Sequence, residues 1–266
     1  MQENHVLVNG NKIRYLEHGD SKDAIVLLHG LGGMAERWLA TVPFLSKGYR
    51  VIAPDLIGYG KSDKPRVDYT PDLFRETILG LLDTLSLHDV AMIGTSLGGE
   101  IVAECAATQN FRIKKIIMVS PAGVMKKSTP VLDAYTMAAL HPTRESVRTA
   151  YQMMIGGDME ISDQSVENFI ANMSNPNART VFLSTLLGMK NAPAITDKLH
   201  LIRVPALLVW GSGDKMIPVE YSKDFASSIS DCQVAIMEGC GHIPYEERPS
   251  EFSKLVLDFL TKQDKS

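Results

Sequence analysis

Apolar and polar positions form two alternating patterns along the chain. Short continuous apolar runs, typical of strands buried on both faces, are separated by stretches in which apolar residues recur at helical spacing. The runs occupy residues 24–29, 50–55, 90–93, 115–119, 205–210 and 233–237. Strands that alternate with helices in this way predict an α/β fold with a mostly parallel central sheet and helices on both faces.

Local signals place several further elements. Asn9-Gly10 lies between two strand-like segments and predicts an antiparallel hairpin at the start of the chain. Thr70-Pro71 supplies a helix N-cap and a first-turn proline before a helical pattern that runs to Leu85. An amphipathic stretch is expected from Trp38 to Leu45, and a last helix around residues 252–260.

The alternation of strand and helix stops between Val124 and Ile195. This segment shows only helical patterns, at residues 143–154, 166–173 and 181–187. It also contains seven of the thirteen methionines of the chain. Methionine is flexible and suits adaptable apolar surfaces, so we expect some of these side chains to line a binding face. The segment therefore looks like an insertion into the α/β domain.

Composition narrows the class of protein. The 266 residues suffice for one large domain with an insertion, and the net charge of −4 gives no reason to expect nucleic acid or a membrane as partner. The three cysteines lack metal-ligand spacing and are interpreted as reduced thiols. No signal peptide and no apolar run of the ~18 residues that a membrane span needs is found. We expect a cytoplasmic protein, and the oligomeric state stays open, a homodimer included.

The strongest chemical signal is Gly94-Thr95-Ser96-Leu97-Gly98, which follows an apolar run and precedes a helix-like segment. In a G-x-S-x-G turn between strand and helix, the serine takes strained backbone angles and its hydroxyl is lifted clear of the sheet. Small residues are needed on both sides of this turn, and Gly94 and Gly98 supply them. The pattern predicts Ser96 as a nucleophile.

Two more residues complete a catalytic set. A serine hydroxyl needs a base to take its proton, and His242 lies in a glycine-rich loop directly after a predicted strand. Asp214 has the same place after the preceding strand, where it could hold the imidazole in the right tautomer. Three such residues, each at the carboxyl end of a strand, predict the triad Ser96, Asp214 and His242.

A tetrahedral intermediate also needs hydrogen-bond donors for its oxyanion. The backbone N–H of Leu97, directly after the nucleophile, is one candidate. The second is expected in the loop after the first buried strand, with the N–H of Leu31 as first choice and that of Gly32 as second. For His29, at the start of this loop, we favour a structural role over a catalytic one.

These motifs together resemble the α/β-hydrolase superfamily, in its capped branch of small esterases and meta-cleavage-product hydrolases. The resemblance runs through His29-Gly30, Pro54-Asp55, residues 58–62, the Ser96 turn, residues 211–214 and Gly241-His242. It implies a core domain of residues 1–123 and 196–266, with residues 124–195 as a helical cap over the active site. It also implies structural roles for Asp55 and Ser62 in a loop at the pocket rim.

Departures from the family patterns bear on the reaction. Ser96 stands where dehalogenases and epoxide hydrolases carry aspartate, so both activities are disfavoured. Meta-cleavage-product hydrolases typically have asparagine before the serine and tryptophan after the histidine, where this chain has Thr95 and Ile243. No cap arginine is obviously placed to hold a dienoate carboxylate, and Arg179 is the nearest candidate.

The leading hypothesis is therefore a serine carboxylesterase for small to medium apolar acyl esters. The alternative is a carbon–carbon bond hydrolase of 2-hydroxy-6-oxo-dienoates that uses the same triad. A receptor for small lactones is a minor alternative from a different functional class. The expected partner is a small-molecule ester, and serine chemistry of this kind needs no metal and no cofactor.

Overall fold

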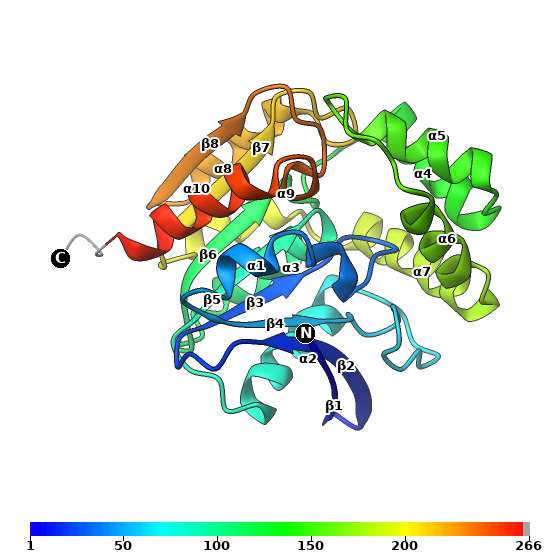
Figure 1. Ribbon diagram of the computed structural model, residues 1–266. Helices are drawn as coiled ribbons and strands as arrows, with labels where there is room; N and C mark the ends of the chain where they lie inside the picture. Colours follow the sequence, from blue (N-terminus) through cyan, green and yellow to red (C-terminus); the bar gives the residue numbers. More distant parts are fainter. Residues whose placement is uncertain (263–266) are drawn as a thin grey trace.

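The central element is an eight-stranded sheet in the order β1-β2-β4-β3-β5-β6-β7-β8 (Figure 1). The structure, a computed structural model, describes residues 1–262. The strands are β1 Gln2–Val8, β2 Asn11–His18, β3 Ala24–Leu28, β4 Arg50–Pro54, β5 Val90–Thr95, β6 Ile113–Val119, β7 Ala206–Gly211 and β8 Cys232–Met237. In the part of the sheet with the order β4-β3-β5-β6-β7-β8, all neighbouring strands are parallel, whereas β2 is antiparallel to both β1 and β4. The predicted α/β fold with a mostly parallel sheet is confirmed.

The antiparallel edge follows from the hairpin signal. Asn9 and Gly10 both have positive φ, 50° and 80°, as a two-residue hairpin turn with right-handed strand twist requires. Val8 and Asn11 are the last pair of the ladder before the turn. The remaining strands are joined by helical crossovers, which is why they run parallel.

Helices cover both faces of the sheet (Figure 1). One set consists of α1 Val42–Leu45, α9 Pro244–Glu247 and α10 Pro249–Thr261, and the other of α2 Pro71–Thr84, α3 Leu97–Ala107 and α8 Ser222–Ser228. As predicted, the Thr70 hydroxyl caps α2 by accepting from Leu73 N–H, 3.3 Å away. The amphipathic stretch after β3 is divided into a 3₁₀ turn, Ala35–Trp38, and the short α1, because Pro43 cannot continue a helix begun before it.

Four helices follow β6 and precede β7 along the chain, and they lie at one side of the sheet (Figure 1). They are α4 Pro130–Leu140, α5 Arg144–Met154, α6 Asp163–Met173 and α7 Pro176–Asn191. Three of them were predicted, and α4 was not. It begins with the same signal as α2, since Thr129 accepts from Leu132 N–H and Pro130 follows in the first turn. All four fall within residues 124–195, and the described part of this segment contains no strand. That this segment forms a cap stays a prediction.

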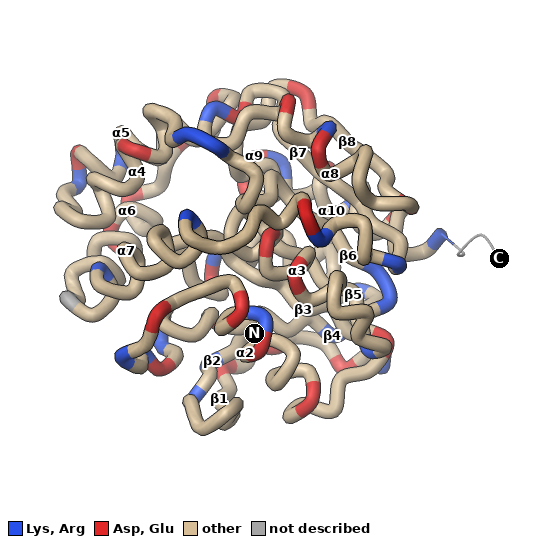
Figure 2. The backbone as a smooth tube through the Cα atoms, turned by 180° about the vertical axis from the view of Figure 1, so that it is seen from behind, with Lys and Arg blue, Asp and Glu red and all other residues tan. Residues whose placement is uncertain are grey.

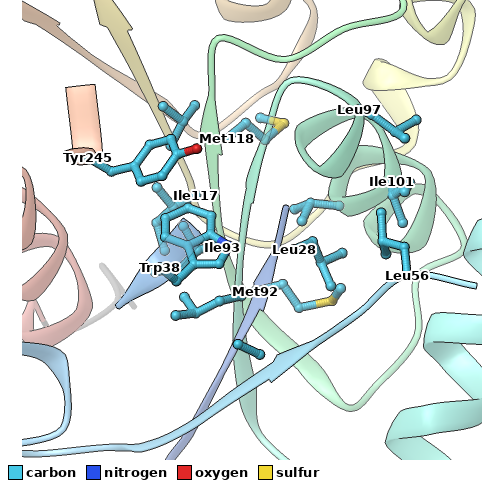
Figure 3. Packing of buried hydrophobic residues seen from close by; sticks show 14 of the residues in the cluster. Leu28, Trp38, Leu56, Met92, Ile93, Leu97, Ile101, Ile117, Met118 and Tyr245 are labelled. Atoms are coloured by element: carbon cyan, nitrogen blue, oxygen red, sulfur yellow. The ribbon is translucent and has the colours of Figure 1, made fainter. Parts of the chain in front are cut away.

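The core beneath the carboxyl ends of the strands is filled by large apolar side chains (Figure 3). Trp38 packs against Tyr245, with ring centroids 4.3 Å apart. Both rings are almost fully buried. Since Tyr245 comes three residues after His242, this packing supports the loop that carries the predicted base.

The charged residues are interspersed along the chain, with Lys and Arg next to Asp and Glu over most of the molecule (Figure 2). Among residues 1–262, no helix has both the length and the apolar character to cross a bilayer. All three cysteines are free thiols.

Candidate active site

Ser96 lies in a strained turn between β5 and α3. Its φ of 52° and ψ of −118° are unusual for a residue with a side chain. The turn is held by the backbone alone: Ser96 N–H donates to Val119 O (2.9 Å), and its carbonyl accepts from Glu100 N–H (3.1 Å) and Ala122 N–H (3.0 Å). The geometry is that expected of a nucleophile turn, and the catalytic role of Ser96 stays a prediction.

The flanking glycines are required by close backbone contacts. A Cβ at Gly94 would lie 2.1 Å from the carbonyl oxygen of Gly98, and a Cβ at Gly98 would lie 2.3 Å from the carbonyl oxygen of Leu28. Carbon and oxygen atoms cannot approach this closely, so any side chain at either position would force the backbone apart. The helix can therefore begin directly against the ends of β3 and β5.

Asp214 and His242 are brought together from the loops after β7 and β8. His242 Nδ1 lies 2.8 Å from Asp214 Oδ2, and both side chains are buried. The other carboxylate oxygen accepts from the backbone N–H groups of Met216 and Ile217, both at 2.9 Å. These bonds fix the carboxylate, which in turn favours the tautomer with the proton on Nδ1 and a free lone pair on Nε2.

His242 Nε2 is buried and has no hydrogen-bond partner within residues 1–262. His242 and Ser96 line the same cavity, without a hydrogen bond between them. Catalytic hydrogen bonds are often long in the absence of substrate, so this arrangement is compatible with proton transfer once a substrate is bound. An unpaired basic nitrogen in the cavity that a serine also lines has the chemistry that a general base needs.

The cavity has a volume of about 390 Å³. It is enclosed on one side by the ends of the strands and on the other by α4, α5 and α6. Its apolar lining comes from both: Leu31, Met34, Leu39, Leu132, Tyr135, Tyr151, Met154, Met159, Ile161, Phe169, Met216, Ile243 and Tyr245. Two of the seven methionines of the predicted insertion, Met154 and Met159, are among these residues, as the sequence led us to expect for some of them.

The loop after β3 lies beside the serine. A Cβ at Gly30 would be only 3.3 Å from Ser96 Cβ, and Gly30, Leu31 and Gly32 all line the cavity. Leu97 is the first residue of α3, so its N–H has no acceptor within the helix. The two predicted donor positions are thus both near Ser96, since Leu31 follows Gly30 and Leu97 follows Ser96 itself, and their role as oxyanion donors stays a prediction.

His29 is buried below this loop. Its Nε2 accepts from Leu56 N–H at 3.0 Å, so the proton is on Nδ1, which donates to Gly30 O at 2.8 Å. Burial lowers the pKa of His29, which keeps the ring neutral in this bridging position. Both nitrogens bond to backbone groups, one in this loop and one in the loop after β4, in agreement with the structural role favoured from the sequence.

Asp55 and Ser62 also have structural contacts. Asp55 accepts from the backbone N–H groups of Ala35 and Lys61, each at 2.8 Å, and from the buried Arg14 guanidinium. Ser62 donates to the Asp55 carbonyl at 2.7 Å. Neither residue lines the cavity, so both hold the surrounding loops.

The cationic side chain in the cavity is Arg37, which the sequence analysis did not single out. Its Nε lies 2.8 Å from Glu246 Oε1, and its guanidinium is 5.2 Å from the centre of the Tyr151 ring. Burial alone would lower the pKa of Arg37, but the Glu246 carboxylate and the neighbouring Tyr151, Tyr245 and Tyr135 side chains together outweigh this effect, and the pKa lies well above its ordinary value. By contrast, Arg179 donates to the Leu140 carbonyl at 3.2 Å and is not among the described residues that line the cavity.

The segment that follows α5 lies directly against the loop that carries His242. His242 N–H donates to Met154 O at 2.7 Å. The Glu247 carboxylate accepts from Gly241 N–H at 2.8 Å and from Gly156 N–H at 2.9 Å. A Cβ at Gly241 would lie 2.1 Å from Met154 O, and one at Gly156 would lie 2.4 Å from the carbonyl carbon of Cys240. The two backbones are therefore in direct contact, without side chains between them.

No cluster of three or more His, Cys, Asp or Glu side chains that could hold a metal ion occurs within the described part of the chain. Two pairs of titratable groups lie at the site, Asp214 with His242 and Arg37 with Glu246.

Comparison with known proteins gives the same fold. A 2-hydroxy-6-oxo-6-(2'-aminophenyl)hexa-2,4-dienoic acid hydrolase of Metapseudomonas resinovorans is 26% identical over 268 residues, which cover 98% of this chain and 91% of that protein. Among solved structures, a bacterial membrane phospholipase A is similar with a TM-score of 0.87 and 25% identity, over 97% of this chain and 85% of the other. A serine hydrolase involved in carbazole degradation also has a TM-score of 0.87 and 25% identity, over 98% of both chains.

The family pattern of the alpha/beta hydrolase fold matches residues 23–249. This range includes β3 to β8, all four helices of the insertion and every residue of the candidate site. The chain belongs to the alpha/beta hydrolase family, and hydrolase activity is the function that this membership supports.

Proposed function

We propose that this protein is a serine carboxylesterase that hydrolyses small to medium esters with apolar acyl groups through an acyl-enzyme. The observation that carries the proposal is the pairing of His242 with the fixed Asp214 carboxylate, which leaves Nε2 unbonded in the cavity that Ser96 also lines. The apolar lining favours a substrate whose acyl chain is a hydrocarbon.

In the first half of the reaction, His242 Nε2 takes the proton of the Ser96 hydroxyl while Oγ attacks the ester carbonyl. The carbonyl oxygen gains negative charge, which the N–H groups of Leu31 and Leu97 stabilise. The carbon–oxygen bond to the alcohol then breaks, and the alcohol leaves with the proton from Nε2. In the second half, water replaces the alcohol, loses a proton to His242 and releases the acid from Ser96.

The test is kcat/KM for p-nitrophenyl esters of increasing chain length, with wild type and Ser96→Ala. We expect the rate to be highest for short to medium chains and to be abolished by the substitution. Ser120→Ala is the matched control, since Ser120 also follows a central strand with positive φ and is buried, yet it does not line the cavity. Negligible turnover by the wild type, or full activity of Ser96→Ala, would contradict the proposal.

A second candidate is the hydrolysis of a carbon–carbon bond next to a ketone in a dienoate. Arg37 favours it, because a charged guanidinium in a mostly apolar cavity could bind a substrate carboxylate. The similar Metapseudomonas hydrolase is named for a dienoic acid of this class. Water would add its hydroxyl to the acyl fragment and its proton to the carbon fragment.

Arg37→Met separates the two candidates. A carboxylate substrate held by Arg37 should lose about tenfold or more in kcat/KM, since a hydrogen-bonded charge pair contributes about 1.5–3 kcal/mol. A neutral ester should be affected little. If the wild type cleaves esters and leaves the absorbance of 2-hydroxy-6-oxo-6-phenylhexa-2,4-dienoate unchanged, the second candidate is excluded.

A further inference from the structure

Two side chains of the insertion hold the loop that carries the proposed oxyanion donors. Tyr135, on α4, donates its hydroxyl to Leu31 O at 2.8 Å. Asn172, on α6, donates its amide to Gly32 O at 3.2 Å. The preceding carbonyl, Gly30 O, is held from within the core by Gly33 N–H (3.0 Å) and by His29 (2.8 Å). Three consecutive carbonyls of the loop are thus fixed, two of them by the insertion.

Holding a carbonyl also sets the direction of the next N–H. A peptide group is planar and trans, so its C=O and N–H point in opposite directions. The bonds to Gly30 O therefore orient the N–H of Leu31, and the bond from Tyr135 to Leu31 O orients the N–H of Gly32. The bond from Asn172 to Gly32 O orients the N–H of Gly33, which itself donates to Gly30 O, so Asn172 acts on the N–H of Leu31 through that peptide. The N–H groups of Leu31 and Gly32 are the two backbone groups of this loop that are candidates for the oxyanion hole.

The Tyr135 hydroxyl is firmly placed for this bond. The ring is buried among Tyr151, Phe169 and Phe182, with centroid distances of 6.5, 5.4 and 6.0 Å. Burial raises the pKa of Tyr135 well above its ordinary value, so the hydroxyl keeps its proton and remains a donor.

The loop itself depends on this contact. Gly32 has a φ of 71°, and a Cβ there would lie 2.9 Å from the Tyr135 hydroxyl oxygen and 3.2 Å from Phe182 Cε2. A glycine in a left-handed conformation has many alternative backbone angles once its neighbours are released. The side chains of the insertion therefore restrict this segment beyond the bonds to Gly30 O that the loop makes by itself.

We infer that Tyr135 and Asn172 are positioning residues of the oxyanion hole, so that this hole is complete only while α4 and α6 are docked on the loop. The inference rests on the proposed function, because it takes Leu31 or Gly32 as an oxyanion donor. The insertion would then take part in catalysis as well as forming one wall of the cavity. A substrate that props the insertion open would bind and yet react slowly.

The test compares Tyr135→Phe with Tyr69→Phe. Each change removes one phenol hydroxyl that donates to a backbone carbonyl, Leu31 O at 2.8 Å or Pro65 O at 2.9 Å, and Tyr69 does not line the cavity. We expect Tyr135→Phe to lower kcat about tenfold with little change in KM, which is less than the ~10²–10³ for loss of a direct donor. The affinity for a trifluoromethyl ketone, which forms the tetrahedral adduct, should fall by the same factor.

Asn172→Leu should act in the same direction, and the double variant should lose less than the product of the two single effects, because both act on one loop. Equal kcat and equal ketone affinity for Tyr135→Phe and Tyr69→Phe would overturn the inference. A drop in thermal stability with unchanged kcat would do the same, since it would show a structural role alone.

Labelling of Ser96 by a fluorophosphonate distinguishes a failure of the positioning role from a failure of the proposed function. This reagent needs only an activated serine and oxyanion donors, whatever the natural substrate. If the wild type is not labelled, the proposed function fails. If the wild type is labelled and Tyr135→Phe is labelled equally fast, only the positioning role fails.

Discussion

The strand-end loops and the insertion build opposite walls of one cavity by different means. At the strand ends, position is set by backbone: a serine with positive φ, glycines whose Cβ would lie within 2.3 Å of another carbonyl, and backbone N–H groups on Asp214. In the insertion, position is set by side chains, such as the aromatic cluster around Tyr135 and the bonds from Tyr135 and Asn172. We therefore expect the strand-end loops to tolerate few substitutions and the insertion to tolerate many.

This difference separates chemistry from selectivity. Under the proposed function, backbone geometry has to be the same for any substrate that reacts at Ser96, whereas the methionines and aromatic rings of the other wall can change without loss of the proposed triad. We therefore expect substitutions in the strand-end loops to affect all substrates alike. Those in the insertion should affect substrates differently, apart from the two that hold the oxyanion loop.

The largest effect is expected for Asp214→Asn, which breaks the strand-end wall. An amide in place of the carboxylate no longer favours the proton on His242 Nδ1, and the loss in kcat should be about 10⁴-fold for every ester tested. Steady-state kinetics on two esters of different chain length measure it. Asp83→Asn, at an exposed ion pair with Arg112, is the control and should be near wild type. A loss confined to one ester would show that Asp214 acts on binding and not on the base.

The next effect is on folding. Gly98→Ala would place Cβ against the Leu28 carbonyl, and we expect the free energy of unfolding to fall by about 3 kcal/mol, as for severe overpacking. Gly48→Ala is matched to it, because a Cβ there has open space and the change should be neutral or slightly stabilising. Urea unfolding of both variants measures the difference in stability. Equal urea midpoints for Gly98→Ala and Gly48→Ala would mean that the turn tolerates a side chain.

A pH-dependent effect concerns Glu100, one turn after Ser96 on α3. Burial, with Glu104 nearby and against the attraction of Lys198, raises the pKa of Glu100 from 4.5 to about 8. Between these values the unfolded chain has lost a proton that the folded protein keeps. The free energy of unfolding therefore decreases as pH rises, by at most about 1.4 kcal/mol per unit.

Glu100→Gln removes this titration. We expect the variant to unfold like the wild type at pH 4 and to be more stable at pH 8, as measured by thermal unfolding over pH 4–9. The same pH dependence in both proteins would show that Glu100 is ionised in the folded state.

The smallest effect tests the bond between the two walls. Glu247→Ala leaves Gly241 and Gly156 N–H without an acceptor, and we expect kcat to fall about tenfold, with faster proteolysis after α5. Glu251→Ala, whose carboxylate pairs with the exposed Arg248, is the control. Unchanged kcat together with faster proteolysis would limit Glu247 to holding the insertion.

The sequence predicted most of what the backbone determines. Asn9-Gly10 specified the hairpin, Thr70-Pro71 the start of α2, and Gly94 to Gly98 the strained turn, because each is a local requirement on backbone angles or contacts. Helix α4 could have been predicted from the same signal, Thr129-Pro130, but its weak periodicity hid it. Pro43 likewise indicated the break before α1.

Arg37, Tyr135 and Asn172 were not predicted, and the reason is physical. Their importance arises from contacts with residues 104 to 209 positions away, such as Gly32, Leu31 and Glu246, that no local pattern encodes. The sequence analysis sought a cation on the insertion and chose Arg179, whereas the structure has one in the core, in the turn after β3. Selectivity in such a site depends on pairings across the fold.

The contact of Gly156 with Gly241 bears on how such proteins can be recombined. A Cβ at either position would collide with the backbone of the other segment. An insertion exchanged between relatives therefore needs a glycine at the position of Gly156, and the core that receives it needs a glycine at the position of Gly241. Chimaeras that join residues 124–195 to a foreign core should therefore fail at this crossing wherever that core has a side chain at the position of Gly241, whatever the lining of their cavities. An exchange that moves the insertion together with the histidine loop avoids this collision.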